Sequence, residues 1–185
     1  MKKGKLFVIS GASGVGKSTV LKRVMEQRKD LTFSVSATTR APRPGEVDGE
    51  SYYFVTRQQF EDMIARGEFL EYDAHMDNYY GTPAAQAEEK MKMGSVILDI
   101  EPNGAFNVRK AKPDAVLIFI APPSLEELHR RLAGRGDTSA EQMKLRQERS
   151  VWEMEQSKKY DYVVINDQVE TCAEEILKII AEKAD

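Results

Sequence analysis

The sequence predicts a three-layer α/β fold with a parallel sheet at its centre. Two observations lead to this prediction. Short apolar runs of strand length alternate along the chain with segments whose apolar residues recur at helical spacing, which is the order expected when helices connect parallel strands. A glycine-rich segment at residues 11–19 joins the first apolar run to the first such helix. The length of 185 residues is within the range of one domain.

The glycine-rich segment fits the pattern G-x-x-x-x-G-K-S/T at every fixed position, with the residues Gly11, Ala12, Ser13, Gly14, Val15, Gly16, Lys17, Ser18 and Thr19. Its glycines allow backbone conformations that turn successive N–H groups toward phosphate oxygens. Lys17 would neutralise the outer phosphates, and the Ser18 hydroxyl would ligate Mg²⁺. The alternative is a chance glycine turn beside an exposed lysine. An apolar run before the segment and a helical pattern after it favour a nucleoside triphosphate site and a P-loop NTPase-type core.

Composition excludes several classes of protein. Apolar residues make up 41% of the chain and charged residues 31%, which is typical of a folded globular protein. The net charge of −3 provides no electrostatic footprint for nucleic acid. Cys172 is the single cysteine, so no intrachain disulfide is possible, and the chain has no apolar run long enough to span a membrane. We therefore expect a cytoplasmic protein with neither nucleic-acid nor membrane partners.

The segment after the first helix predicts a second anion site. Residues 32–36 are strand-like, and the proline-rich residues 37–46 are expected to form a loop that carries Arg40 and Arg43. Arginine offers a fixed fork of donors that suits phosphate. Two exposed arginines on a turn would be the simpler interpretation, but the P-loop makes a second phosphate site the better one.

Residues 37–82 predict a β-rich insertion that closes over a substrate. Strand-like runs at 52–55, 69–72 and 79–81 surround a short helix at 59–66. Thr82 is expected to cap the next helix, with Pro83 in its first turn.

Two carboxylates stand at the end of the buried strand at 96–101. Ligands gather at the carboxyl ends of the strands in such sheets, so Asp99 and Glu101 are candidates for a hydrated metal ion or a substrate. Capping of the helix that begins near Pro102 would explain one of these acids but not both.

The last third of the chain predicts a core strand at 115–121, a helix capped by Ser124, a lid, and a closing strand and helix at 162–166 and 169–184. In the helix after Ser124, we expect Leu125, Leu128 and Leu132 to face the core. Residues 134–158 are polar and begin with two closely spaced glycines, which is typical of a mobile lid. Arginines on the lid either contact phosphate or form a solvated face, and the second interpretation is preferred for Arg149. Two phosphate sites with a lid imply phosphoryl transfer between nucleotides.

Several runs together resemble the guanylate kinases, and the resemblance spans nearly the whole chain: Ser36 to Glu46, Gly49, Tyr52-Tyr53-Phe54 and Asn78-Tyr79-Tyr80-Gly81-Thr82. The resemblance implies ATP-dependent, Mg²⁺-assisted phosphorylation of GMP, and of dGMP, to the diphosphate in purine nucleotide metabolism. It implies that the GMP-binding residues are Ser36, Arg40, Arg43, Tyr52, Glu71, Tyr80, Thr82 and Glu101. Guanine presents N1–H and an amine as donors, which the carboxylates of Glu71 and Glu101 complement, whereas the unprotonated N1 of adenine would be mismatched.

The resemblance also assigns the donor side and the transfer step. ATP would be bound by residues 11–19 with Arg131 and Asn166, of which Asn166 is expected near adenine. Ser18 would be the direct Mg²⁺ ligand, and Asp99 would act through a water molecule. The catalytic residues would be Lys17, Arg40, Asp99, Arg135 and Arg146. The implied division is a core of residues 1–36, 83–133 and 159–185, a GMP-binding subdomain of 37–82 and a lid of 134–158, in a monomer or small homo-oligomer.

Two alternatives stay open. One is a phosphopeptide-binding module that uses the former GMP site, although such a module would have no use for Lys17, Arg135 and Arg146. The other is a kinase for a different monophosphate. Pro102-Asn103 and Asp77 depart from the family pattern beside the expected base pocket, and both departures bear on the choice of base.

Overall fold

The computed structural model describes residues 4–75, 77–133 and 140–184. The chain divides into two compact units. The first contains the described residues up to Val8 and those from Asp30 to Ala115; the second contains Ile9–Lys29 and the described residues from Val116 onward. The boundary falls inside the first strand, β1 (Leu6–Gly11). The division into core, GMP-binding subdomain and lid stays a prediction.

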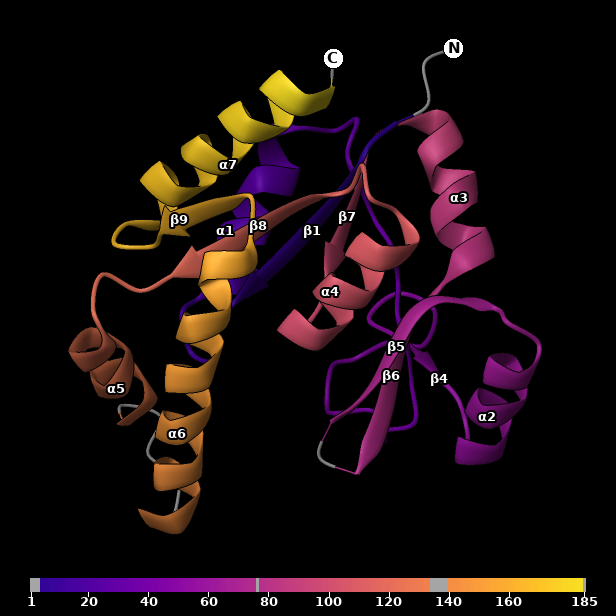
Figure 1. Cartoon of the computed structure of the whole chain (residues 1–185), viewed down its shortest axis with the longest axis horizontal. Coiled ribbons are helices and arrows are strands. Elements are labelled where there is room, and N and C mark those ends of the chain that lie inside the picture. Colours follow the sequence, from indigo (N-terminus) through magenta and orange to yellow (C-terminus); the bar gives the residue numbers. More distant parts are fainter. Residues whose placement is uncertain (1–3, 76, 134–139, 185) are drawn as a thin grey trace. The chain divides into compact units, whose positions relative to one another are not determined.

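A five-stranded sheet confirms the predicted α/β class. Its strand order is β2-β7-β1-β8-β9, and Figure 1 labels each of these strands except β2. The strands other than β1 are β2 (Thr32–Phe33), β7 (Val96–Asp99), β8 (Val116–Ala121) and β9 (Tyr162–Ile165). β2 and β7 form a parallel pair, and β8 and β9 form another. Every residue of β1 and β8 is buried, as expected for parallel strands with helices on both faces.

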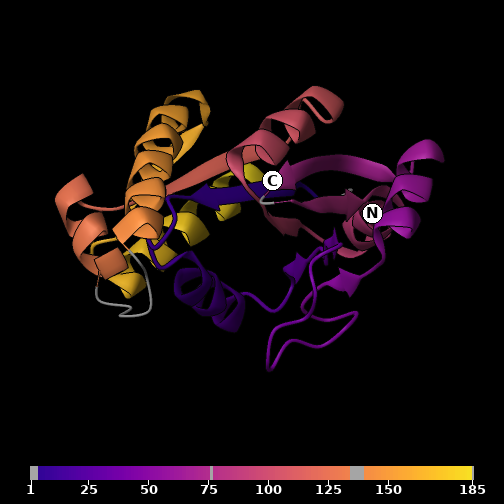
Figure 2. The ribbon, with the colours of Figure 1, turned by 90° about the horizontal axis from the view of Figure 1, so that it is seen from below.

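The second unit supplies the helices that follow β1 and β8. They are α1 (Lys17–Gln27), α5 (Leu125–Ala133), α6 (Ala140–Gln156), the short 3₁₀ helix η1 (Ser157–Lys159) and α7 (Val169–Ala184). α1 and α7 pack together (Figure 2), because each has one apolar face. Cys172 lies on the buried face of α7 and is fully buried, which confirms its prediction as a core residue.

The first unit carries a second sheet of four short strands in the order β4-β3-β6-β5. These strands are β3 (Ala37–Thr38), β4 (Tyr53–Phe54), β5 (Phe69–His75) and β6 (Asn78–Pro83). β5 and β6 form an antiparallel hairpin, and β3 is antiparallel to β6 but parallel to β4. The helices of this unit are α2 (Arg57–Ala65), α3 (Ala84–Met93) and α4 (Pro102–Ala111).

Helix α2 is attached to this sheet through one aromatic cluster. Phe60 is fully buried and stacks on Phe69 at 4.4 Å and on Tyr79 at 5.1 Å between ring centroids. A capping box fixes the start of the helix: the Thr56 hydroxyl accepts from Gln59 N, and Thr56 N donates to the Gln59 side chain. The insertion is therefore a folded layer with its own small core.

Three local predictions were wrong. Ala37–Thr38 is a buried strand and not loop, because β4 and β6 supply partners on both of its edges. Thr82 does not cap α3: it is a residue of β6, its hydroxyl donates to Glu71, and Pro83 holds the N-cap position. Leu125 is 38% exposed, unlike the buried Leu128 and Leu132, because it is the first residue of α5.

In the parts of the chain that the structure describes, no helix combines the length and the hydrophobicity needed to span a bilayer.

Candidate functional site

The described residues form two candidate nucleotide sites, one in each unit. The donor site consists of the segment between β1 and α1 with the side chains that hold it. Gly14 and Gly16 adopt φ angles of 85° and 90°, in the left-handed region that favours glycine. Gly16 is the N-cap of α1, and no side chain among the described residues caps this helix. The first amides of α1 thus form the positive end of the helix, an arrangement suited to phosphate.

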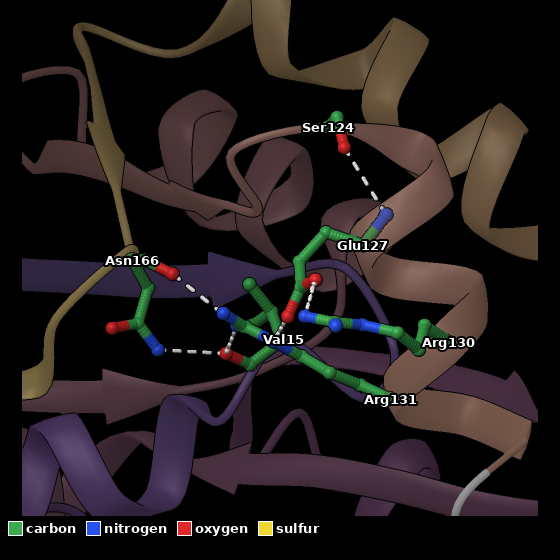
Figure 3. Close-up of polar contacts among 6 residues, drawn as sticks. All are labelled: Val15, Ser124, Glu127, Arg130, Arg131 and Asn166. Carbon is green, nitrogen blue, oxygen red and sulfur yellow. Dashed lines mark hydrogen bonds and ion pairs between the residues drawn. The ribbon is translucent and has the colours of Figure 1, made fainter.

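Two side chains hold the P-loop through the carbonyl oxygen of Val15 (Figure 3). Asn166 donates to this oxygen from Nδ2 at 2.7 Å, and Arg131 approaches it from Nη1 at 3.5 Å. Arg131 Nη1 also donates to the backbone oxygen of Asn166 at 3.2 Å. Asn166 is 3% exposed, and its Oδ1 has no partner among the described residues. Arg131 and Asn166, the two residues outside the loop that were predicted to bind ATP, therefore contact the loop itself.

Glu127 determines where the Arg131 side chain lies. Its carboxylate accepts from Arg131 Nε at 2.7 Å and also pairs with Arg130 (Figure 3). The hydrogen bond from Arg131 lowers the pKa of Glu127, and Ser124 Oγ accepts from Glu127 N at 3.1 Å. Ser124 thus caps α5 as predicted. Glu127 was missed by sequence reasoning, although its spacing of four residues from Arg131 indicated the pair.

The remaining donor-side predictions have different outcomes. Lys17 and Ser18 are the first two residues of α1, and Ser18 is exposed. Arg146 lies on α6 and is half-buried. Arg135 lies outside the described residues. Glu153, which the sequence did not single out, is fully buried and accepts a hydrogen bond from the backbone of Ser13.

The acceptor site in the first unit is built around a buried pair on the β5–β6 hairpin. Glu71 and Thr82 are opposite each other in the strand register. Thr82 Oγ1 donates to Glu71 Oε1 at 2.6 Å. Glu71 is 6% exposed, and burial raises its pKa to about 7. The structure therefore brings together two of the three residues predicted to recognise the base.

Helix α4 approaches this pair closely. A Cβ atom built on Gly104 would lie 2.7 Å from Glu71 Oε2, so only glycine leaves room for the carboxylate. Glu101 is the N-cap of α4 without a side-chain capping bond, and it is exposed. Glu101 thus holds the N-cap position, but its carboxylate does not cap α4 by a hydrogen bond, so the alternative that this acid serves as a cap is wrong.

A pocket of about 200 Å³ opens beside the end of β7. Asp99 lines it together with the predicted phosphate ligands Ser36 and Tyr52; the other lining residues are Phe33, Ser34, Val35, Glu50 and Ser51. Asp99 is exposed, unlike the three buried residues that precede it in β7. One concave surface is therefore lined by two acidic residues, three serines and two aromatic residues.

Arg40 already has an anionic partner in this structure. Its Nη2 pairs with Glu46 Oε1 at 2.8 Å, and its guanidinium lies 5.4 Å from the ring centroid of Tyr52. The hydrogen bond to Glu46 is the main cause of a raised pKa of Arg40, and a hydrogen bond with Tyr80 adds to it. Glu46 also accepts from Arg43 N at 2.7 Å, while Arg43 is exposed. Arg40, Tyr52 and Tyr80 thus form one cluster, with Glu46 as an anion that sequence reasoning missed.

Comparison with known proteins decides the family. The family model described as "Guanylate kinase" matches residues 3–183. The chain belongs to the guanylate kinase family. Guanylate kinases are 48% identical to it in Lactococcus lactis, over 97% of this chain and 88% of the relative, and 49% identical in Thermus thermophilus, over 96% and 81%. The crystal structure of guanylate kinase from Anaplasma phagocytophilum has a TM-score of 0.81 at 34% identity and covers 98% of this chain and 87% of that one.

Proposed function

We propose that this guanylate kinase family member transfers the γ-phosphoryl group of ATP to GMP, and to dGMP, and releases ADP and the guanosine diphosphate. The observation that carries the proposal is the match to guanylate kinases over residues 3–183. A P-loop in the left-handed glycine conformation and a buried acceptor pair support it. The reaction needs positioning and charge neutralisation more than covalent chemistry, so no nucleophilic side chain is required.

On the donor side, the loop of residues 11–19 and the Lys17 ammonium bind the ATP phosphates; the amides of Ser13 and Val15 are not among the donors, because they bond to Glu153 and to Ala12 O. Arg131 and Asn166 support this loop through Val15 O, and the buried Oδ1 of Asn166 is available to accept from the adenine amine. A buried acceptor without a donor costs free energy, which favours a donor supplied by the nucleotide.

The metal that the reaction implies is Mg²⁺. Ser18 in one unit offers a hydroxyl oxygen, and Asp99 in the other offers carboxylate oxygens; each residue is exposed within its own unit, and hard oxygen atoms are the ligands that Mg²⁺ prefers. When bound with ATP, the ion neutralises phosphate charge. Ser18 would be a direct ligand and Asp99 would act through a water molecule.

On the acceptor side, the Glu71 carboxylate accepts from guanine N1–H and the exocyclic amine, with Thr82 and Glu101 completing base recognition. The phosphate is bound by the cluster around Arg40 with Ser36, Arg43, Tyr52 and Tyr80. Tyr52 and Glu46 keep Arg40 in place before the nucleotide arrives. Lys17, Arg40, Arg135 and Arg146 then stabilise the charge of the phosphoryl group in transit.

The first test measures ADP formation from Mg-ATP with GMP, dGMP, AMP, CMP and UMP. Turnover with the guanine nucleotides alone, and its loss in Lys17→Ala, is the expected result. Turnover with another monophosphate would reject the roles of Glu71 and Thr82. Binding of GMP without any turnover would favour the phosphopeptide-binding alternative. A cytoplasmic location, a role in purine nucleotide metabolism and a monomer or small homo-oligomer are further parts of this proposal.

A further inference from the structure

Helix α6 places a charged side chain against the P-loop. Glu153 is 0% exposed. Its Oε2 accepts from Ser13 N at 2.7 Å, and its Oε1 accepts from Ser13 Oγ at 3.2 Å and from Arg149 Nε at 2.9 Å. The carboxylate of Glu153 is thus hydrogen-bonded to a loop residue 140 positions earlier in the chain.

The cost of this arrangement argues for a specific role. Burial of a carboxylate is expensive, and hydrogen bonds from charged or backbone donors only offset the expense. An apolar side chain of similar volume is often at least as stabilising as a buried ion pair. Stability alone therefore does not explain a buried glutamate at position 153, whereas a need to fix the geometry of its partner does.

The partner of Glu153 is the residue at which the P-loop turns. Ser13 directly precedes Gly14, and the next bond, Val15 N to Ala12 O at 3.0 Å, closes the turn. Since Glu153 takes the Ser13 N–H, the orientation of this peptide is set by α6. The other end of the turn is held at Val15 O by Asn166 and Arg131. The loop is therefore braced from both sides by side chains of its own unit.

The same helix face carries a predicted catalytic arginine. Arg146, Arg149 and Glu153 follow one another at intervals of three and four residues, which places them along one side of α6. Seven residues of α-helix separate Arg146 from Glu153 by about 10 Å along the axis. A fixed contact at Glu153 thus determines the distance of Arg146 from the loop.

We propose that Glu153 is a positioning residue: through Ser13 it holds the P-loop in the form that receives the phosphates of ATP, and it ties that loop to the helix that carries Arg146. This inference rests on the proposed role of the P-loop in ATP binding. Glu153 itself touches neither nucleotide. Its loss is expected to weaken ATP binding and transfer without affecting GMP, since the predicted GMP residues belong to the other unit.

The test compares Glu153→Gln and Glu153→Met with Glu155→Gln, which removes an exposed carboxylate from the same helix. In Glu153→Gln, the side-chain amide nitrogen replaces an oxygen that accepts from Ser13 or Arg149, so a donor faces a donor. We expect the loop to shift and the KM for Mg-ATP to rise about tenfold or more. In Glu153→Met, the side chain fills the same volume, and the KM for Mg-ATP should rise similarly while the urea midpoint is retained. The KM for GMP should stay within about twofold in both, and Glu155→Gln should match the wild type.

Two results of these kinetic measurements would overturn the inference. One is a KM for Mg-ATP within about twofold of the wild type in both Glu153 variants. The other is an equal rise of both KM values with a lowered urea midpoint, as general destabilisation would produce.

Direct titration with ATP of the wild type and of Lys17→Ala separates this inference from the proposed function. If Lys17→Ala binds ATP normally, the proposed donor site is wrong and the role of Glu153 falls with it. If only the Glu153 variants bind normally, the positioning role alone is wrong.

Discussion

Glu71 is the residue at which burial and chemistry compete most directly. Its carboxylate is buried beside one hydroxyl donor, Thr82, which offsets only part of the desolvation. The pKa of Glu71 is consequently raised to about 7, and the protonated form is favoured below that pH. The stabilising contribution of this group to folding is complete below pH 4.5 and is lost as the pH rises through about 7. Guanine donors have the opposite preference, since they bind the ionised form.

This conflict predicts a pH-dependent KM for GMP. Between about pH 8 and about pH 6, the ionised fraction of Glu71 falls about tenfold, and the KM for GMP should rise by about the same factor. Steady-state kinetics at saturating Mg-ATP measure this change. The phosphate of GMP titrates in the same range, so Glu71→Gln is the control: it should retain only the slope that the phosphate causes. A KM for GMP that is equal at the two pH values in the wild type would contradict the prediction.

Gly104 makes a second prediction at the residue scale. In Gly104→Ala, the added methyl would lie 2.7 Å from Glu71 Oε2 and displace the carboxylate. Alanine is favoured over glycine inside a helix by about 1 kcal/mol, so α4 itself should not suffer. We expect the KM for GMP to rise about tenfold with little change in the melting temperature. Lys110→Ala, an exposed change near the end of the same helix, should leave both quantities nearly unaltered. A normal KM for GMP in Gly104→Ala would show that Glu71 adjusts without loss.

At the scale of elements, the β5–β6 hairpin is held in register by its turn and by its aromatic face. Asp77 in the turn has a φ of 63°, the only positive φ of a non-glycine residue in the described ranges. Gly81 of β6 leaves room for the ring of Phe69, whose Cδ1 atom would lie 2.8 Å from an added Cβ. Glu71 and Thr82 meet because this register places them opposite each other.

The strain at Asp77 gives a prediction for the turn. The left-handed region is less favourable by about 1–2 kcal/mol for a residue with a Cβ atom. For aspartate this free-energy difference is smaller, because its side chain forms local hydrogen bonds. Asp77→Ala should therefore be less stable than Asp77→Gly by about 1 kcal/mol, a difference of about 2–4 °C in melting temperature for a chain of this size. Calorimetry of the two variants beside the wild type tests this. Equal melting temperatures would mean that the turn relaxes to a negative φ.

At the scale of the whole molecule, the two candidate sites belong to different compact units. The predicted base and acceptor-phosphate residues lie between Ser36 and Glu101, whereas the P-loop, Arg131, Arg146 and Asn166 lie in the other unit. Each nucleotide should therefore act first on its own unit. Binding stabilises whatever part of the chain contacts the ligand, by about 2.7 kcal/mol at about a hundred times the dissociation constant.

Hydrogen exchange with mass spectrometry measures this separation. GMP alone should slow amide exchange in peptides from residues 34–104, and Mg-ATP alone should slow it in peptides from residues 9–27 and 160–168. Chelation of Mg²⁺ should reduce the ATP effect, abolish turnover and leave the GMP effect intact. Lys17→Ala should behave like the chelated protein toward ATP. Protection of the P-loop by GMP alone would contradict this assignment.

The fold and much of the site follow from local patterns in the sequence. The glycine spacing of residues 11–19, the apolar runs of β1 and β8 and the cap at Ser124 each depend on residues close together in the chain. Such patterns determine backbone conformation directly. The two-residue strand β3 escaped prediction because only its neighbours make it a strand, whereas β4 lies within the strand-like run predicted at 52–55. Thr82 was misplaced as a cap because its true partner, Glu71, lies eleven positions away across a hairpin.

By itself, the sequence determined the α/β class and the glycine-rich loop at residues 11–19, and it supplied the residues that we propose for a guanine nucleotide site. Only the tertiary structure decided which side chains meet. It paired Glu153 with Ser13, Asn166 with Val15 and Gly104 with Glu71, over separations that no periodicity encodes. Helix and strand preferences act between near neighbours, whereas these contacts arise when the packing of the core brings distant segments together and leaves each buried polar group to find a partner.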